Sequence, residues 1–154
     1  MNYGLTDKSH IYDYVNKVVD ALGGGEPAKL LLLETAAAET GFGDARDASW
    51  NVGMGLMQFD PIGYTDVLQR TTKATKDKVL SKLGVNVDAV KYEDLRYNPF
   101  LSVLFARLKY LLVKSPIPTT LAGRANYWKV YYNSVLGAGT PSYYMSAAAK
   151  YGVV

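Results

Sequence analysis

The segment that most constrains the fold is residues 27–41, which read PAKLLLLETAAAETG. A helix with this sequence carries apolar side chains on every side, whereas a surface helix confines them to one stripe. Such a helix must be covered by other elements of the protein. The segment therefore predicts a buried central helix that opens near Pro27 and ends at Gly41, with the glycines at 23–25 stopping the helix before it.

The rest of the chain is typical of helices that surround such a centre. Residues 8–22 place apolar side chains on one helical face. Asn98 and Thr140 each precede a proline, a pattern that predicts an N-cap followed by the first helical residue. Residues 42–62 show little periodicity, and we expect an ordered loop there with at most a small β-hairpin. The remaining helices are expected at about 64–71, 74–83, 98–113, 121–135 and 140–152, which makes residues 1–154 one mainly α domain.

The composition excludes several classes of function. The chain has 154 residues, 49% of them hydrophobic and 20% charged, as in ordinary soluble globular proteins. Because there is no cysteine, no disulfide or thiolate metal site can form, and the single histidine, His10, cannot build a zinc site. No phosphate-binding loop and no strand-linked G-x-G-x-x-G motif occurs, so nucleotide binding has no support.

Charge and aromatic content leave more than one partner open. The net charge of +3 and the pI of about 8.9 favour acidic partners such as nucleic acid or an anionic cell wall. The thirteen tyrosines suit stacking on sugars or bases as well as half-buried packing. Residues 1–15 lack a basic region followed by an apolar run, so we expect no signal peptide. The apolar stretches are too short to form an integral membrane segment.

Glu39 is the first candidate for chemistry. It lies at the end of the apolar helix, where apolar surroundings would disfavour its charged form and raise its pKa, as a general acid near neutral pH requires. The alternative is an ordinary helix-end carboxylate turned to solvent. Glu34 lies five residues earlier, a rotation of about 140°, and so it does not share a face with Glu39. We expect Glu34 to meet a basic partner inside the fold.

Three aspartates follow in and after the glycine-containing loop: Asp44, Asp47 and Asp60. Glycoside hydrolysis with inversion needs an acid and a second carboxylate that activates water, roughly 6.5–9.5 Å apart. Chain geometry permits Glu39 to reach such a separation from Asp47 or Asp60. Each aspartate taken alone is typical of a turn.

Three segments together resemble the signature of lytic transglycosylases and goose-type lysozymes. They read ETGFG at 39–43, GMGLMQFD at 53–60 and YYNSVLGAGTPSYY at 131–144. In that family an E-[ST] pair ends a buried helix, G-L-M-Q follows after a loop, and a Y-N-x-G-like segment comes later. The likeness spans residues 27–145 in the family's order. It implies a lysozyme-like fold, which belongs to the α+β lysozyme superfamily.

The resemblance also implies roles for individual residues. Glu39 would be the catalytic acid/base, and the activity would be cleavage of the β-1,4 bond between N-acetylmuramic acid and N-acetylglucosamine. Tyr132 would place its hydroxyl near the catalytic carboxylate or the substrate's N-acetyl group, and Asn133 would orient this segment. The sugar groove would be formed by this pair together with the backbone from Met54 to Met57 and the residues Met57, Gln58 and Phe59.

Two departures and one addition bear on the reaction type. The family's YNAG becomes YNSVLGAG here, and the loop after Glu39 is shorter than in goose-type lysozymes. Goose-type lysozymes carry an aspartate at the position of Asp60, whereas many lytic transglycosylases have an apolar residue there. Asp60, with Asp47 as a second candidate, therefore favours hydrolysis by water over attack of the muramoyl C6 hydroxyl, which leaves a 1,6-anhydro end.

We expect a monomer that acts on bacterial peptidoglycan strands with no metal or organic cofactor and no nucleic-acid partner. The absence of a signal peptide suggests a bacteriophage origin, either as an endolysin released from the host cytoplasm by a holin or as a virion-associated lysin. Two alternatives stay open. One is a non-catalytic glycan-binding virion protein, and the other is a helical nucleic-acid-binding module with strongly salt-dependent affinity.

Overall fold

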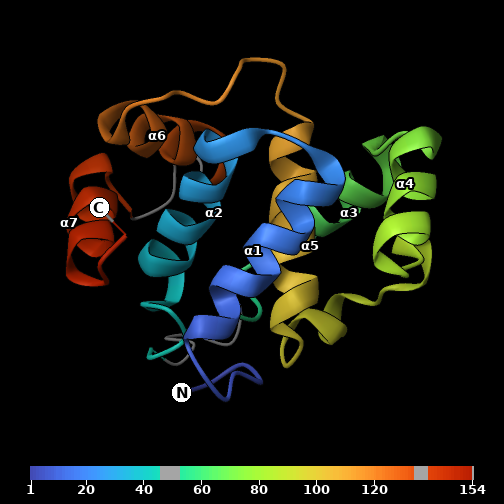
Figure 1. The fold of residues 1–154 in the computed structure, drawn as a ribbon, viewed down its shortest axis with the longest axis horizontal. Coiled ribbons are helices and arrows are strands. Elements are labelled where there is room, and N and C mark those ends of the chain that lie inside the picture. Colours follow the sequence, from blue (N-terminus) through green and yellow to red (C-terminus); the bar gives the residue numbers. More distant parts are fainter. Residues whose placement is uncertain (46–52, 134–138, 154) are drawn as a thin grey trace.

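The computed structural model describes residues 1–45, 53–133 and 139–153. Helix α2 (Gly25–Thr40) passes through the middle of the molecule, and most of its side chains are buried (Figure 1). This placement confirms the central helix that its all-round apolar sequence predicts. Four helices pack against it, namely α1 (Ser9–Leu22), α5 (Pro99–Leu111), α6 (Leu121–Trp128) and α7 (Pro141–Lys150).

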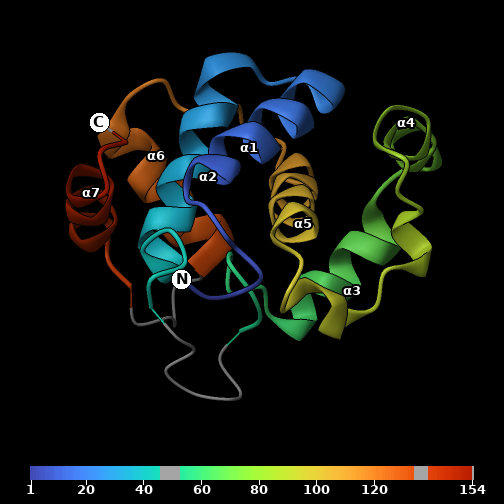
Figure 2. The ribbon, with the colours of Figure 1, turned by 60° about the horizontal axis from the view of Figure 1, so that its bottom comes forward.

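Two further helices lie on the side of α5 away from α7 (Figures 1 and 2). Helix α3 (Pro61–Arg70) packs against α5, and α4 (Lys73–Leu83) packs against α1. Short 3₁₀ turns at Val87–Ala89 and Tyr92–Leu95 lead the chain back into α5. The protein is mainly helical, and none of its described helices is both long and apolar enough to cross a membrane.

The helix starts follow the capping chemistry of the sequence. Asn98 accepts a hydrogen bond from the Leu101 N–H at 3.0 Å, and Thr140 accepts one from the Tyr143 N–H at 3.1 Å. Both predicted N-caps are confirmed. The predicted start of α3 near residue 64 is wrong by three residues, because Asp60 caps a helix whose first residue is Pro61.

One other element differs from its prediction. The helix expected at 121–135 is α-helical only as far as Trp128, and Lys129–Asn133 form a π-helical turn. In the loop at 42–62, Met54 and Phe59 form an isolated antiparallel bridge, and the described part of the chain contains no strand. Within this segment, residues 42–45 and 53–60 are held by single contacts, among them hydrogen bonds to the hydroxyl groups of Thr40 and Tyr132.

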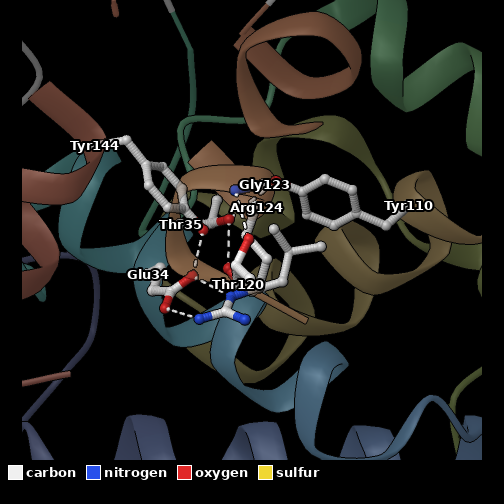
Figure 3. A network of polar contacts seen from close by, with 8 residues as sticks. Glu34, Thr35, Tyr110, Thr120, Gly123, Arg124 and Tyr144 are labelled. Atoms are coloured by element: carbon white, nitrogen blue, oxygen red, sulfur yellow. Dashed lines mark hydrogen bonds and ion pairs between the residues drawn. The ribbon is translucent and has the colours of Figure 1, made fainter. Parts of the chain in front are cut away.

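A buried ion pair joins α2 to α6 and α7 (Figure 3). The Arg124 guanidinium donates to both carboxylate oxygens of Glu34, at 2.7 and 2.9 Å, and the Tyr144 hydroxyl donates to the same carboxylate at 2.8 Å. Glu34 has no exposed surface, and Arg124 is 3% exposed. The prediction that Glu34 meets a basic partner inside the fold is confirmed.

Candidate active site

Glu39 is the penultimate residue of α2, and its carboxylate emerges where the helix ends at Gly41. The side chain is half-buried, and the Trp128 indole N–H donates to its Oε2 at 2.9 Å. Burial raises the pKa of Glu39 to about 7, although the Trp128 hydrogen bond and the charge of Lys109 act in the opposite direction. A carboxyl group with this pKa can both donate and accept a proton near neutral pH.

Glu39 also borders a cavity of about 200 Å³ between the C-terminal end of α2 and α7. The α7 side of this cavity is formed by Tyr143, Ser146 and Lys150, all of which are exposed. Tyr151 closes it beyond the helix end. The cavity therefore gives the Glu39 carboxylate access to a ligand from solvent, beside aromatic rings and hydroxyl groups of the kind that bind sugars.

The three sequence segments that resemble the lysozyme signature contact one another through two hydroxyl groups. The Thr40 hydroxyl donates to the Leu56 carbonyl at 2.8 Å and accepts from the Gly43 N–H at 3.1 Å. The Tyr132 hydroxyl donates to the Met57 carbonyl at 2.6 Å. The turn at 55–58 is therefore fastened to the end of α2 on one side and to the segment after α6 on the other.

The backbone of this turn explains its glycine and its glutamine. Gly55 has φ +76°, and a Cβ atom there would lie 2.0 Å from the Leu95 carbonyl oxygen, so no larger residue fits. Gln58 has φ +47°, a conformation that costs a non-glycine residue of order 1–3 kcal/mol. Its side-chain amide donates to the Gly55 carbonyl at 3.0 Å. Such strain is common at binding and catalytic sites, and the Gln58 side chain is half-buried there.

The apolar residues of the same segment do not line a groove. Met57 is 0% exposed and Phe59 is 1% exposed. The Phe59 ring packs against Phe105 and Tyr132, with ring centroids 5.9 and 6.1 Å apart. The expectation that Phe59 forms a groove wall is therefore wrong, because its side chain belongs to the hydrophobic core. The Met57 side chain lies in the core as well, whereas the expectation for Met57 concerns its backbone. The backbone carbonyl of Met57 accepts a hydrogen bond from the Tyr132 hydroxyl.

Tyr132 and Asn133 hold the turn after α6. The hydroxyl of Tyr132 is committed to the Met57 carbonyl, and the structure gives it no hydrogen bond to Glu39. Its ring is nevertheless close enough that the Glu39 charge adds to burial in raising the pKa of Tyr132. The Asn133 side chain accepts from the Lys129 ammonium at 3.0 Å, within the π-helical turn. The orienting role of Asn133 stays a prediction.

Of the two aspartates predicted to assist Glu39, only Asp60 lies among the described residues. Asp60 is half-buried, and its Oδ1 accepts from the Gly63 N–H as the N-cap of α3. Its charge raises the pKa of Glu39, so the two carboxylates lie within electrostatic reach of each other. Asp47 lies outside the described residues. Asp44 forms an ion pair with Lys8.

Lys109 and Trp128 are members of the site that sequence reasoning missed. Lys109, on α5, is half-buried, and its ammonium donates to the Tyr132 carbonyl at 3.3 Å. The same ammonium lies 4.7 Å from the centroid of the Tyr132 ring. Burial lowers the pKa of Lys109, whereas the carboxylates of Asp60 and Glu39 raise it. Lys109 and Trp128 occur in ordinary helical patterns, and only the fold brings them to Glu39.

No cluster of three histidine, aspartate or glutamate side chains capable of holding a metal ion occurs within residues 1–45, 53–133 and 139–153. Comparison of the chain with protein-family models, with curated proteins and with solved structures found no match.

Proposed function

We propose that this protein is a lysozyme-like muramidase that cleaves the β-1,4 bond between N-acetylmuramic acid and N-acetylglucosamine in peptidoglycan. One observation carries the proposal, namely a half-buried Glu39 with a pKa of about 7 beside a cavity that opens to solvent. The GLMQ turn at 55–58 and the YN pair at 132–133 support it, because hydrogen bonds fasten both to the region of Glu39.

In the proposed reaction, protonated Glu39 donates its proton to the glycosidic oxygen as the bond to the anomeric carbon breaks. The resulting carboxylate is stabilised by the Trp128 N–H and by the positive charge of Lys109. Glu39 then accepts a proton from the group that attacks the anomeric carbon. The same residue serves as acid and base, which a pKa near 7 favours.

Hydrolysis and transglycosylation differ in the attacking group. For hydrolysis, water would be activated by a second carboxylate, and Asp60 is the described candidate because its charge already acts on Glu39. Its Oδ1 is occupied by the Gly63 N–H, and Oδ2 accepts no hydrogen bond from a described residue. If Asp60 serves only as a helix cap, the C6 hydroxyl of the muramoyl residue attacks and 1,6-anhydro ends form.

The test is mass spectrometry of soluble products from purified peptidoglycan. We expect the native protein to release muropeptides, Glu39→Gln to release none, and the circular dichroism of the two proteins to agree. Reducing muramic acid ends that disappear in Asp60→Asn would establish hydrolysis through Asp60, whereas 1,6-anhydro ends that persist in Asp60→Asn would establish a lytic transglycosylase. No glycan products from the native protein would refute the enzymatic proposal and favour a glycan-binding virion protein.

We further propose that the protein is a phage endolysin or virion-associated lysin. This assignment rests on the muramidase activity proposed above and extends it to a lytic role. Lysis of bacteria from outside by the purified protein, compared with lysis on co-expression with a holin, would distinguish the two roles.

A further inference from the structure

Arg107, on α5, is a buried cation without an anionic partner among the described residues. It is 5% exposed, and its hydrogen-bond partner is neutral, since NH2 donates to the Gly23 carbonyl at 3.0 Å. Its Nε is buried with no hydrogen-bond acceptor in the described part of the chain. A guanidinium has five N–H donors, so the bond to Gly23 leaves most of them unused. Burying an unpaired charge is costly, and buried arginines are normally paired with an anion.

The Arg107 guanidinium packs closely against the turn that precedes α2. Gly24 has φ +112°, and a Cβ atom there would lie 2.6 Å from Arg107 NH2. Gly24 is also the N-cap residue of α2 and supplies no side-chain cap, so the first N–H groups of that 16-residue helix have no side-chain acceptor. The positive end of the helix dipole therefore adds to the positive potential around Arg107, and the exposed carboxylate of Glu26 in the first turn of α2 offsets part of it.

A cavity of about 360 Å³ lies in front of these groups. Gly24, Pro27, Arg107 and Lys114 border it, and apart from Ser115 the rest of its wall is apolar or aromatic. No carboxylate borders it, and Lys114 is exposed without an ion pair to any described residue. The hydroxyl of Tyr127, another wall residue, is committed to the Ser115 carbonyl at 2.8 Å.

We propose that this cavity, the Arg107 pocket, binds the oxyanion of a small organic molecule, a carboxylate or a phosphate group. Arg107 provides the directed donors, Lys114 a second positive charge at the mouth, and the aromatic and apolar wall a surface for the body of the ligand. The volume is within the range of about 300–1,000 Å³ that is usual for small-molecule sites. The pocket is separate from the candidate active site, because Gly24 and Glu39 lie at opposite ends of α2, on the order of 20 Å apart along the helix.

The experiment observes the guanidinium directly. The chain has five arginines, so the ¹H–¹⁵N spectrum of the arginine Nε–Hε groups is simple, and Arg107→Lys assigns the signal. Native protein is titrated with sodium phosphate and, separately, with sodium benzoate, each against sodium chloride at matched ionic strength. We expect a saturable shift of the Arg107 signal and a rise in melting temperature on the order of 5 °C with at least one of these oxyanions.

Variants separate the pocket from general charge effects. Arg107→Lys keeps the charge but loses the planar fork, and we expect at least about a tenfold weaker response in melting temperature. Lys114→Met should weaken the response less, and the exposed control Arg70→Lys should leave it unchanged. Glu39→Gln should also leave it unchanged, whether or not the proposed muramidase activity exists.

A response to phosphate alone would identify a phosphate-bearing ligand, and a response to benzoate alone would identify an organic carboxylate. The proposal is overturned if the Arg107 signal does not move with either oxyanion, or if chloride moves it equally. It is also overturned if Arg107→Lys responds as the native protein does. The melting-temperature rise of the native protein and its weakening in Lys114→Met do not depend on the folding of Arg107→Lys. These two measurements therefore stay decisive if that variant fails to fold, and no rise with either oxyanion overturns the proposal.

Discussion

The titration of Glu39 is the most direct consequence of the site geometry. Its pKa in the folded protein is about 7, against the ordinary value of 4.5. Between these two values the folded protein binds a proton that the unfolded chain has released, so the free energy of unfolding falls as the pH rises from 4.5 through 7. This contribution to stability is present in full below pH 4.5 and is lost above 7.

The size of the effect follows from the shift and from the partial exposure of Glu39. A difference of one pKa unit corresponds to about 1.4 kcal/mol, so the full shift would amount to roughly 3 kcal/mol. Because the carboxylate is only half-buried, solvent screens part of the effect. We therefore expect a loss on the order of 2 kcal/mol between pH 4.5 and pH 8 in the native protein. Glu39→Gln removes this titration and should be the more stable protein at pH 8.

Two measurements check the prediction. Urea unfolding at several pH values gives the free energy of unfolding of the native protein and of Glu39→Gln. The indole N–H signal of Trp128 reports the carboxylate itself, because that group donates to Glu39. The chain has two tryptophans, and Trp50→Phe assigns the signals. The reasoning is refuted if the Trp128 signal titrates near pH 4.5, or if Glu39→Gln shows the same loss of stability as the native protein.

Three further predictions concern Lys109, the Glu34–Arg124 ion pair and Gly55. Lys109→Met removes a positive charge and should raise the pKa of Glu39, so the pH profile of the Trp128 signal moves upward; an unchanged profile would show that Lys109 has no electrostatic role. Arg124→Met leaves the Glu34 carboxylate buried without a cation, which should cost about 3–5 kcal/mol in urea unfolding, and Glu34→Met in addition should recover much of that loss. Gly55→Ala should lower the free energy of unfolding by about 2 kcal/mol, because the Gly55 backbone is left-handed and a Cβ there would meet a neighbouring carbonyl group. The exposed Gly84→Ala variant is the control, and a smaller loss for Gly55→Ala than for this control would contradict the account.

Much of the framework follows from local sequence patterns. The all-round apolar segment predicts the central helix because its side chains can be covered only from several directions. Asn98 and Thr140 are correct as N-caps because capping depends on neighbours within three residues. Glu39 and Glu34 are separated correctly because helical geometry alone places them on different faces.

The partners of Glu39 could not be predicted in this way. Trp128 and Lys109 reach it from helices that are distant in the sequence, and their local patterns are those of ordinary helical residues. The core position of Phe59 could not be predicted for a related reason. Its ring packs against Phe105 and Tyr132, which are distant in the sequence, so no local pattern separates a core ring from a groove wall.

The π-helical turn at 129–133 has a consequence for how the protein can change during evolution. A π-turn holds one residue more than the α-helical turn that it replaces, and each helical residue rotates the chain by about 100°. Deleting one residue there would let α6 continue as a regular helix and would turn Tyr132 away from the Met57 carbonyl, while Trp128 upstream kept its contact with Glu39. The hydrogen bonds from Tyr132 to Met57 and from Trp128 to Glu39 can therefore form together only because of the additional residue in the π-turn. A homologue with a one-residue deletion at this place would keep the fold and lose the fastening of the 55–58 turn.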